Sequence, residues 1–374
     1  MRIAVVHEWL TSHAGSEKVV EQILQLYPEA DLFSLVDFLS PEQRHFIGHR
    51  SVQTSFIQEL PFAKRAFRQY LPLMPLAVEQ FDLSGYDVVI SSNHAVAKGI
   101  LTAPHQLHIS YVHTPIRYAW DLQHQYLQQA GLEQGPKSVL TRLILHYLRL
   151  WDSTSANRVD RFIANSNFIA RRIWRAYRRP AKVIYPPVDV SRFDWQQPRE
   201  NFYLTVSRFV PYKRVDLTVK AFNQLGLPLV VIGDGSDWER IKAMAGQNIR
   251  LLGKQPDAVV TDYMQRCKGF IFPAEEDFGI TPVEAQAAGA PVIAFGRGGA
   301  TETVIHGKTG VLFPQQTVES LVQAIQSFEM GMYELKLETL RQQAEKFSIA
   351  HFHTQFCNCV EQTHTDFLQG NPLE

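Results

Sequence analysis

The feature that most constrains the fold is an alternation of short apolar runs and helical patterns that occurs twice along the 374 residues. In the first half, the apolar runs lie at residues 3–7, 31–36, 52–57, 87–93, 105–113, 161–166 and 182–188. Helical patterns, such as residues 18–27 and 138–151, separate them. Buried runs that alternate with amphipathic helices predict a parallel sheet with helices on its faces.

A polar, proline-containing boundary follows, with Pro186-Pro187 and residues 194–200. The alternation then restarts, with apolar runs at 202–209, 227–235, 249–253, 267–273, 291–296 and 310–314. The sequence therefore predicts an α/β protein with two doubly wound domains, residues 1–188 and 200–348. Residues 349–374 predict a last helix, which we expect to pack back on the first domain.

Composition narrows the classes of partner. The 37 basic and 37 acidic residues balance, so no overall field recruits nucleic acid, and we expect no nucleic-acid partner. Three cysteines do not make a disulfide framework, which favours free thiols in a reducing compartment. The apolar start is too short for a signal or membrane-spanning segment, so we expect a cytoplasmic protein.

Polar and glycine-rich loops follow the predicted strands. In open parallel sheets, ligands bind at the carboxyl ends of the strands. The first domain offers 14–16, 92–94 and 113–115, and the second offers Arg208 with Lys213, 233–235, 276–281 and 296–299. A basic pair, glycine turns and acids at a helix start suit a diphosphate that carries a sugar.

The stretch 272–295 holds the acidic turn. Thr281 is predicted to be the N-cap of a helix, with Pro282 at its first position and Glu284 completing a capping box. The alternative interpretation is that amides at this helix start face a phosphate. Glu276 and Glu284 would then hold sugar hydroxyls on either side of that phosphate.

Each of the other candidates has a structural and a functional interpretation. Arg208 and Lys213 are either solvated cations or a clamp on a diphosphate. Gly15 is either a tight turn or a close backbone approach to a ligand. His113 either is structural or faces the ligand, with Arg117 and Asp121 in support. No loop has the spacing of a dinucleotide or nucleoside-triphosphate fingerprint, and no metal constellation is evident.

Two basic stretches that contain aromatic residues, 62–75 and 170–182, leave a further choice open. They are either solvated helix faces or contacts with an anionic membrane surface or a lipid pyrophosphate.

The ordered set of Gly15, His113 in YVHTPIR, Arg208, Lys213, and the two glutamates of EDFGITPVE resembles glycosyltransferase family 4, retaining enzymes of the GT-B fold. The resemblance covers nearly the whole chain. The stretches HEWL with GSEKVVEQ, and YVHTPIRYAWDLQHQYL, are similar to WbaZ-like mannosyltransferases of bacterial polysaccharide assembly. The chain departs from the family at Ala14 and Asp277, where glycine is common.

The resemblance implies two Rossmann-like domains that face a cleft, and a role for each candidate. The implied catalytic residues are His113, Glu276, Arg208 and Lys213. The implied donor-binding residues are Gly15, Arg208, Lys213, Gly233, Gly253, Lys254, Glu276, Phe278, Gly279, Ile280, Thr281 and Glu284. The acceptor would be held by His94, Arg117 and Asp121. Within this set, Glu284 would bind the ribose and His113 would lie over the donor sugar.

The implied reaction is retaining transfer of mannose or glucose from a nucleotide sugar to a polysaccharide or lipid-linked oligosaccharide. GDP-hexose is the favoured donor and UDP-glucose the next. Neither a metal nor another cofactor is expected. The protein would work in the cytoplasm, at the inner face of the plasma membrane if residues 62–75 and 170–182 contact lipid. The alternatives are a sugar-nucleotide epimerase of the same fold and a non-catalytic copy that binds saccharide.

Overall fold

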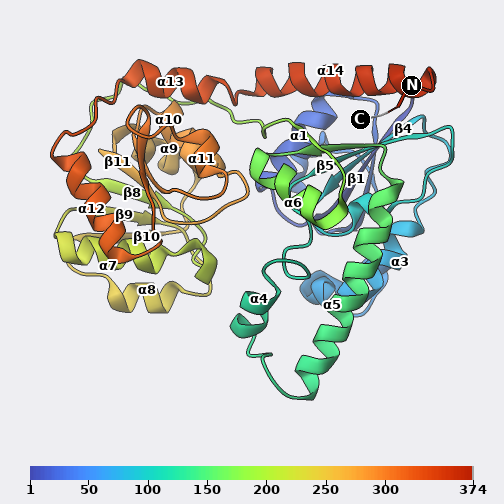
Figure 1. Ribbon diagram of the computed structural model, residues 1–374, viewed down its shortest axis with the longest axis horizontal. Coiled ribbons are helices and arrows are strands. Elements are labelled where there is room, and N and C mark those ends of the chain that lie inside the picture. The colour runs from blue at the N-terminus through green and yellow to red at the C-terminus, as the bar shows by residue number, and fades with distance from the viewer. Residues whose placement is uncertain (373–374) are drawn as a thin grey trace. The chain divides into compact units, whose positions relative to one another are not determined.

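The computed structural model describes residues 1–372, and the chain divides into two compact units. The first unit contains Met1–Tyr185 and the C-terminal segment from His353, and the second contains Pro186–Phe352. Helix α14 (Ile349–Leu368; Figure 1) therefore starts in the second unit and ends in the first. Within the first unit, its His353 Nε2 lies 2.9 Å from Gln22 Oε1.

The first unit is built on a seven-stranded parallel sheet in the order β3-β2-β1-β4-β5-β6-β7. The strands are β1 (Ile3–Leu10), β2 (Asp31–Asp37), β3 (Val52–Thr54), β4 (Val88–Asn93), β5 (Leu107–Val112), β6 (Arg161–Ala164) and β7 (Lys182–Val183). Central β1 pairs with both β2 and β4, so Val5 lies between Leu32 and Ile90. Strands buried on both faces explain the nearly continuous apolar runs.

Helices cover the faces of this sheet, and some of them extend beyond it. They are α1 (Gly15–Leu26), α2 (Ala63–Ala66), α3 (Met74–Glu79), α4 (Gln123–Gln129), α5 (Pro136–Ser155) and α6 (Asn167–Tyr177). Short 3₁₀ turns are η1 (Pro41–Ile47), η2 (Phe56–Glu59), η3 (Phe67–Leu73), η4 (Ala97–Gly99) and η5 (Ala156–Arg158). The run predicted at 52–57 is a strand only to Thr54, because Ser55 caps η2 by accepting from the Ile57 amide at 3.2 Å.

A buried ion pair fixes the loop after β4. Lys98 in η4 is fully buried, and its Nζ lies 2.7 Å from Asp152 Oδ1 and 2.8 Å from Ser155 Oγ on α5. Trp120 Nε1 donates to the same Asp152 carboxylate at 2.7 Å. A buried charge needs such partners, so this loop is tied to α5.

The second unit has a six-stranded parallel sheet in the order β10-β9-β8-β11-β12-β13. Its strands are β8 (Tyr203–Val206), β9 (Leu229–Ile232), β10 (Ile249–Gly253), β11 (Gly269–Phe272), β12 (Val292–Phe295) and β13 (Gly310–Phe313). Its helices are η6 (Pro211–Lys213), α7 (Val215–Leu225), α8 (Trp238–Met244), α9 (Asp257–Arg266), α10 (Ile280–Ala287), α11 (Ala300–Thr303), α12 (Val318–Glu329) and α13 (Leu337–Glu345). The predicted α/β class with two parallel-sheet, Rossmann-like domains is confirmed.

Among residues 1–372, no helix combines the length and the apolar character needed to cross a bilayer.

Candidate functional site

In the second unit, the structure brings Lys213 and Glu276 together. Lys213 ends η6 in the loop after β8, and Glu276 lies in the turn after β11, the strand beside β8. Lys213 Nζ lies 2.5 Å from Glu276 Oε1, with side chains 18% and 13% exposed. The carboxyl ends of neighbouring parallel strands thus place a cation and a carboxylate, distant in sequence, at one point.

Arg208 lies in the same loop as Lys213 but makes no ion pair within residues 1–372. The residue is exposed, and its Nη2 lies 3.1 Å from the Tyr212 hydroxyl. A guanidinium without a carboxylate partner keeps its forked donors available for an anion such as a phosphate.

Glu284 has a partner that the sequence analysis missed. Its side chain is buried on α10, and Arg192 Nη2 donates to its Oε1 at 2.8 Å. Arg192 lies between the two predicted domains, where no periodicity marks it as part of a site. A buried carboxylate is stabilised by such a charged donor.

The predicted capping box at Thr281 is wrong. Helix α10 begins at Ile280, and its N-cap is Gly279, with φ +86° and no side-chain cap. Thr281 therefore lies inside the first turn. Glycine adopts this left-handed conformation without a Cβ penalty, so the helix starts earlier than the side-chain signal indicated, and Glu284 pairs with Arg192.

A glycine-rich loop after β12 supports the acidic turn. The Gly299 amide donates to Glu276 O at 2.8 Å. A Cβ at Gly299 would lie 2.3 Å from Phe278 Cα, and one at Gly298 would lie 2.4 Å from Glu276 O. The buried Phe278 ring packs at 5.5 Å from that of Phe347. Close backbone contact therefore holds Glu276 in place, and only glycine permits it.

The predicted glycine turns lie at the carboxyl ends of β9 and β10. Gly233 has φ +144°, and a Cβ there would lie 1.7 Å from Ser207 O, beside Arg208. Gly253 has φ +69°, and Lys254 after it is exposed. The Gly233 turn therefore packs directly on the loop that carries the predicted diphosphate clamp.

In the first unit, His113 follows β5 and is partly exposed. Its Nε2 lies 2.9 Å from Ser92 Oγ at the end of β4, and Asn165 Nδ2 donates to its carbonyl at 2.9 Å. Desolvation, with the nearby rings of His94 and His7, lowers the pKa of His113 to about 3. The imidazole is therefore neutral near pH 7.

Two further residues join His113, and the sequence analysis missed both. His7 Nδ1 lies 3.1 Å from Ser92 Oγ, and His7 Nε2 lies 3.5 Å from Glu17 Oε1 in the first turn of α1. Burial would raise the pKa of Glu17, but the neighbouring His7 ring lowers it to about 2. Helix α1 starts at Gly15, so the predicted loop glycine is its first residue.

His94 is held by a buried carboxylate, Glu8 of β1. Glu8 is fully buried, and its Oε1 accepts from the amides of Val96 at 2.7 Å and Ala97 at 3.1 Å. His94 Nδ1 pairs with its Oε2. Although burial acts to raise the pKa of Glu8, His94, His7 and the Ala97 amide lower it to about 2. Polar residues inside an apolar strand give no periodic signal.

Asp121, another of the predicted acceptor residues, is held by α6. Asp121 pairs with Arg172 Nη2 of α6, and Arg172 Nη1 donates to Thr114 Oγ1 at 2.9 Å. The structure therefore joins Asp121 to α6 and not to His113. Arg117 is partly exposed after β5.

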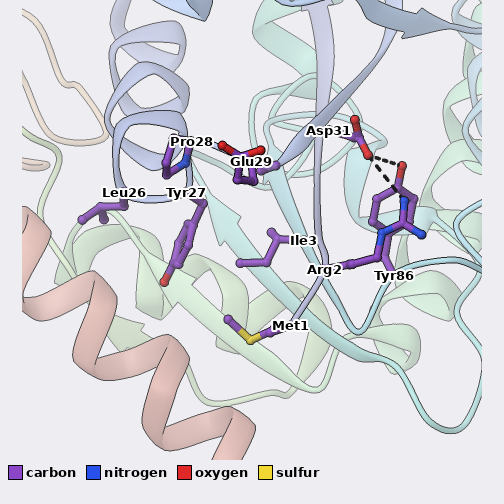
Figure 2. A pocket seen from close by; sticks show the side chains of 10 residues that line it. Met1, Arg2, Ile3, Leu26, Tyr27, Pro28, Glu29, Asp31 and Tyr86 are labelled. Atoms are coloured by element: carbon purple, nitrogen blue, oxygen red, sulfur yellow. Dashed lines mark hydrogen bonds and ion pairs between the residues drawn. The ribbon is translucent and has the colours of Figure 1, made fainter.

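A cavity of about 430 Å³ lies in the first unit near the amino ends of its strands (Figure 2). Arg2, Tyr27, Asp31 and Tyr86 are among its lining residues, and the Tyr86 hydroxyl donates to Asp31 Oδ2 at 2.8 Å. None of the predicted site residues lines it, and ligands of parallel sheets bind at the other end. Within residues 1–372, no group of three or more His, Cys, Asp or Glu side chains forms a metal site, and metal independence stays a prediction.

Two family models match consecutive parts of the chain. Glycosyltransferase Family 4 matches residues 15–192, and Glycosyl transferases group 1 matches residues 189–347. A similar protein is an uncharacterized glycosyltransferase of Methanocaldococcus jannaschii, 31% identical over 194 residues, 50% of this chain and 54% of that protein. The alpha-1,3/1,6-mannosyltransferase alg-2 of Neurospora crassa is 25% identical over 265 residues, 56% of each. The chain spans about half the length of the curated relatives it matches.

Among solved structures, the chain is similar to the Anabaena protein HepE in complex with UDP, with a TM-score of 0.70. The identity is 18%, over 97% of this chain and 100% of that chain, which shows a shared fold alone. The WbaZ-like subgroup stays a prediction. Residues 15–192 and 189–347 therefore match two consecutive glycosyltransferase family models, in a chain with the GT-B fold.

Proposed function

We propose that the protein is a retaining glycosyltransferase that transfers a hexose from a nucleotide sugar to a saccharide acceptor. The observation that carries this proposal is the Lys213–Glu276 pair at neighbouring strand ends, with the exposed Arg208 in the same loop. Two cations suit a diphosphate, and a carboxylate held by backbone contacts suits sugar hydroxyls. The two matched families support transfer as the reaction class.

The chemistry follows from charge. The bond between the anomeric carbon and the diphosphate oxygen breaks, and negative charge develops on the leaving diphosphate. Arg208, Lys213 and the amides at the start of α10 stabilise that charge. The acceptor oxygen bonds to the same face of the anomeric carbon, and its proton passes to the leaving phosphate. Glu276 orients the sugar through its hydroxyls.

GDP-hexose is the donor that we favour, with UDP-glucose next. The resemblance to mannosyltransferases of polysaccharide assembly supports the first choice, as does the mannosyltransferase named above. The HepE structures in complex with UDP and with UDP-glucose support the second. The acceptor that we propose is a polysaccharide or lipid-linked oligosaccharide, reached in the cytoplasm at the inner face of the plasma membrane.

The test is a donor panel of GDP-mannose, GDP-glucose and UDP-glucose with the purified full chain. Two quantities would be measured together: the release of nucleoside diphosphate, and the formation of a glycosidic product that keeps the anomeric configuration of the donor sugar. Lys213→Ala and Glu276→Ala should each reduce kcat roughly 10²–10³-fold, as expected when a charged transition-state contact is removed. Lys268→Ala is the matched control. Lys268 forms an ion pair with Glu329 at 2.7 Å, and it lies just before β11, at the opposite end of the sheet from Lys213.

Each alternative gives a distinct result. Turnover with none of these donors contradicts the proposed reaction. Interconversion of the free donor without an acceptor would indicate an epimerase. Nucleotide binding that Lys213→Ala abolishes, without any turnover, would indicate a non-catalytic copy.

A further inference from the structure

At the carboxyl end of the first sheet, four polar side chains from four elements form one continuous run. Glu17 lies on α1, His7 on β1, Ser92 on β4, and His113 follows β5. The successive distances are 3.5 Å from Glu17 Oε1 to His7 Nε2, 3.1 Å from His7 Nδ1 to Ser92 Oγ, and 2.9 Å from Ser92 Oγ to His113 Nε2. The first three side chains are at most 3% exposed at the residue level.

The Ser92 hydroxyl couples the two rings. A hydroxyl carries one hydrogen, so it can donate to only one of the two imidazole nitrogens. If it accepted from both, the hydrogen of this fully buried hydroxyl would have no acceptor within residues 1–372, so Ser92 donates to one ring and accepts from the other. Which ring nitrogen of His113 carries hydrogen therefore depends on which ring nitrogen of His7 carries hydrogen. The Glu17 carboxylate can only accept, which favours a hydrogen on His7 Nε2.

Two arrangements satisfy these requirements. When His7 is neutral, its bare Nδ1 accepts from Ser92, and Ser92 accepts from an N–H at His113 Nε2, so His113 Nδ1 is a bare acceptor. When His7 is protonated, its Nδ1 donates to Ser92, and Ser92 donates to His113 Nε2. The hydrogen of neutral His113 then lies on Nδ1, which becomes a donor.

We propose that Glu17, His7 and Ser92 are positioning residues that set whether His113 presents an acceptor or a donor at Nδ1 to a sugar hydroxyl. Within residues 1–372, His113 is partly exposed and its Nδ1 has no hydrogen-bond partner, so the proposal assigns this nitrogen to the ligand. The identification of the ligand as a sugar rests on the proposed function; the coupling of the two rings does not.

The surroundings of His113 agree with a ring that holds one hydrogen. Its lowered pKa keeps it neutral, so Nδ1 and Nε2 differ in role. The His94 ring lies 6.4 Å away and the Tyr111 ring 5.2 Å away, measured between ring centroids. His94 in turn pairs with the buried Glu8. These titratable groups face His113 without a hydrogen bond to its ring.

Ring-nitrogen NMR of the ligand-free full chain tests the coupling, because protonated and bare imidazole nitrogens resonate far apart. His7 and His113 are assigned from the signals lost in His7→Gln and His113→Gln. Neutral His7 must accompany His113 protonated at Nε2, and protonated His7 must accompany His113 protonated at Nδ1. Either mismatched combination, at any pH, overturns the proposal.

The chain contains a matched control. Ser91 precedes Ser92 on β4, faces the other side of the sheet, and lies 2.9 Å from Nε2 of the buried His108. In Ser92→Ala, the nitrogen signals of His113 should indicate a mixture of rings protonated at Nδ1 and rings protonated at Nε2. In Ser91→Ala, these signals should be the same as in the wild type. An unchanged His113 in Ser92→Ala, or an equal change in both variants, contradicts the coupling.

Kinetics test the role in transfer. Ser92→Ala should lower kcat/KM for the nucleotide sugar at least tenfold, Ser92→Thr should restore it by returning a hydroxyl, and Ser91→Ala should have no effect. Affinity for the free nucleoside diphosphate should not change, because its proposed contacts lie in the second unit. Full activity of Ser92→Ala would overturn the positioning role. Absence of wild-type turnover would contradict the proposed function, and the NMR result would still decide the coupling.

Discussion

Glu8 is an ionised carboxylate inside an apolar strand, kept charged by backbone amides and His94. Its pKa of about 2, and the similar pKa of Glu17, lie below the ordinary value of 4.5. The unfolded chain therefore binds these protons first as the pH falls. Each group contributes stability that is present above about pH 4.5 and is lost as the pH falls toward 2.

We predict that Glu8→Gln lowers the free energy of unfolding at pH 7 by ~3 kcal/mol. The free energy of unfolding should also fall less steeply in the variant than in the wild type between pH 4.5 and pH 2. Denaturant unfolding at several pH values measures both effects. The control is Glu133→Gln, an exposed glutamate of the same unit. An acid-induced loss of stability as steep as that of the wild type would contradict the assignment.

Gly299 illustrates a steric requirement without backbone strain. Its φ of −64° suits any residue, but a Cβ would lie 2.3 Å from Phe278 Cα. We predict that Gly299→Ala destabilises the second unit by about 1–3 kcal/mol and lowers activity, because the turn that carries Glu276 must move. Gly296→Ala is the control, since its nearest contact is 3.3 Å. Equal unfolding midpoints and activities in the two variants would show that the turn is not held in this way.

At the scale of elements, helix α5 presents an apolar stripe that nothing covers within residues 1–372. Its exposed large apolar side chains are Val139, Leu140, Leu143, Tyr147 and Leu150. Residues 136–151 contain no acid, and Lys137 and Arg142 lie on the same helix, which extends beyond the sheet (Figure 1). An apolar stripe with basic neighbours suits an anionic lipid surface.

The predicted lipid contact through residues 62–75 and 170–182 stays a prediction. Phe62 is 80% exposed and Trp174 is 51% exposed. However, Arg172 pairs with Asp121, and Arg179 donates to the Val159 carbonyl at 2.9 Å. Part of the basic charge of the second stretch is therefore used inside the protein.

We predict that replacing Leu140, Leu143 and Leu150 together with serine lowers binding to vesicles with anionic lipid at least tenfold. Cosedimentation measures it, and the fold should survive because all three side chains are exposed. Met330→Ser with Met332→Ser removes similarly exposed apolar area from the second unit as a control. Wild-type protein that stays in the supernatant would contradict a membrane contact.

At the scale of the whole molecule, the cations and helix start proposed to hold the diphosphate, Arg208, Lys213 and the first turn of α10, belong to the second unit. A nucleoside diphosphate at a hundredfold excess over its Kd should stabilise the folded state by about 2.7 kcal/mol. We predict that hydrogen exchange slows most in β8, β11 and α10, and that Lys213→Ala removes this protection. Protection confined to the first unit would contradict the assignment.

The sequence predicted the elements better than their ends. Every predicted apolar run contains a strand, because burial on both faces leaves a continuous local signal. The predicted start of α10 was wrong, because the left-handed conformation of Gly279 starts the helix two residues before the favourable side-chain cap at Thr281. Local patterns do not report such backbone choices.

The candidate site divides in the same way. Lys213, Glu276 and His113 were found because each lies just after a predicted strand. His7, Glu8, Glu17 and Arg192 were missed, because a polar residue within an apolar strand, in a first helical turn or in a linker resembles a solvated one.

By itself, the sequence determined the order of elements and the two parallel sheets, because hydrophobic periodicity is a local property of the chain. Only the tertiary structure decided which polar groups meet. The order β2-β1-β4-β5 places His7, Ser92 and His113 in one run, and the adjacency of β8 and β11 pairs Lys213 with Glu276. Such contacts depend on strand order and packing between distant segments, which periodicity does not encode.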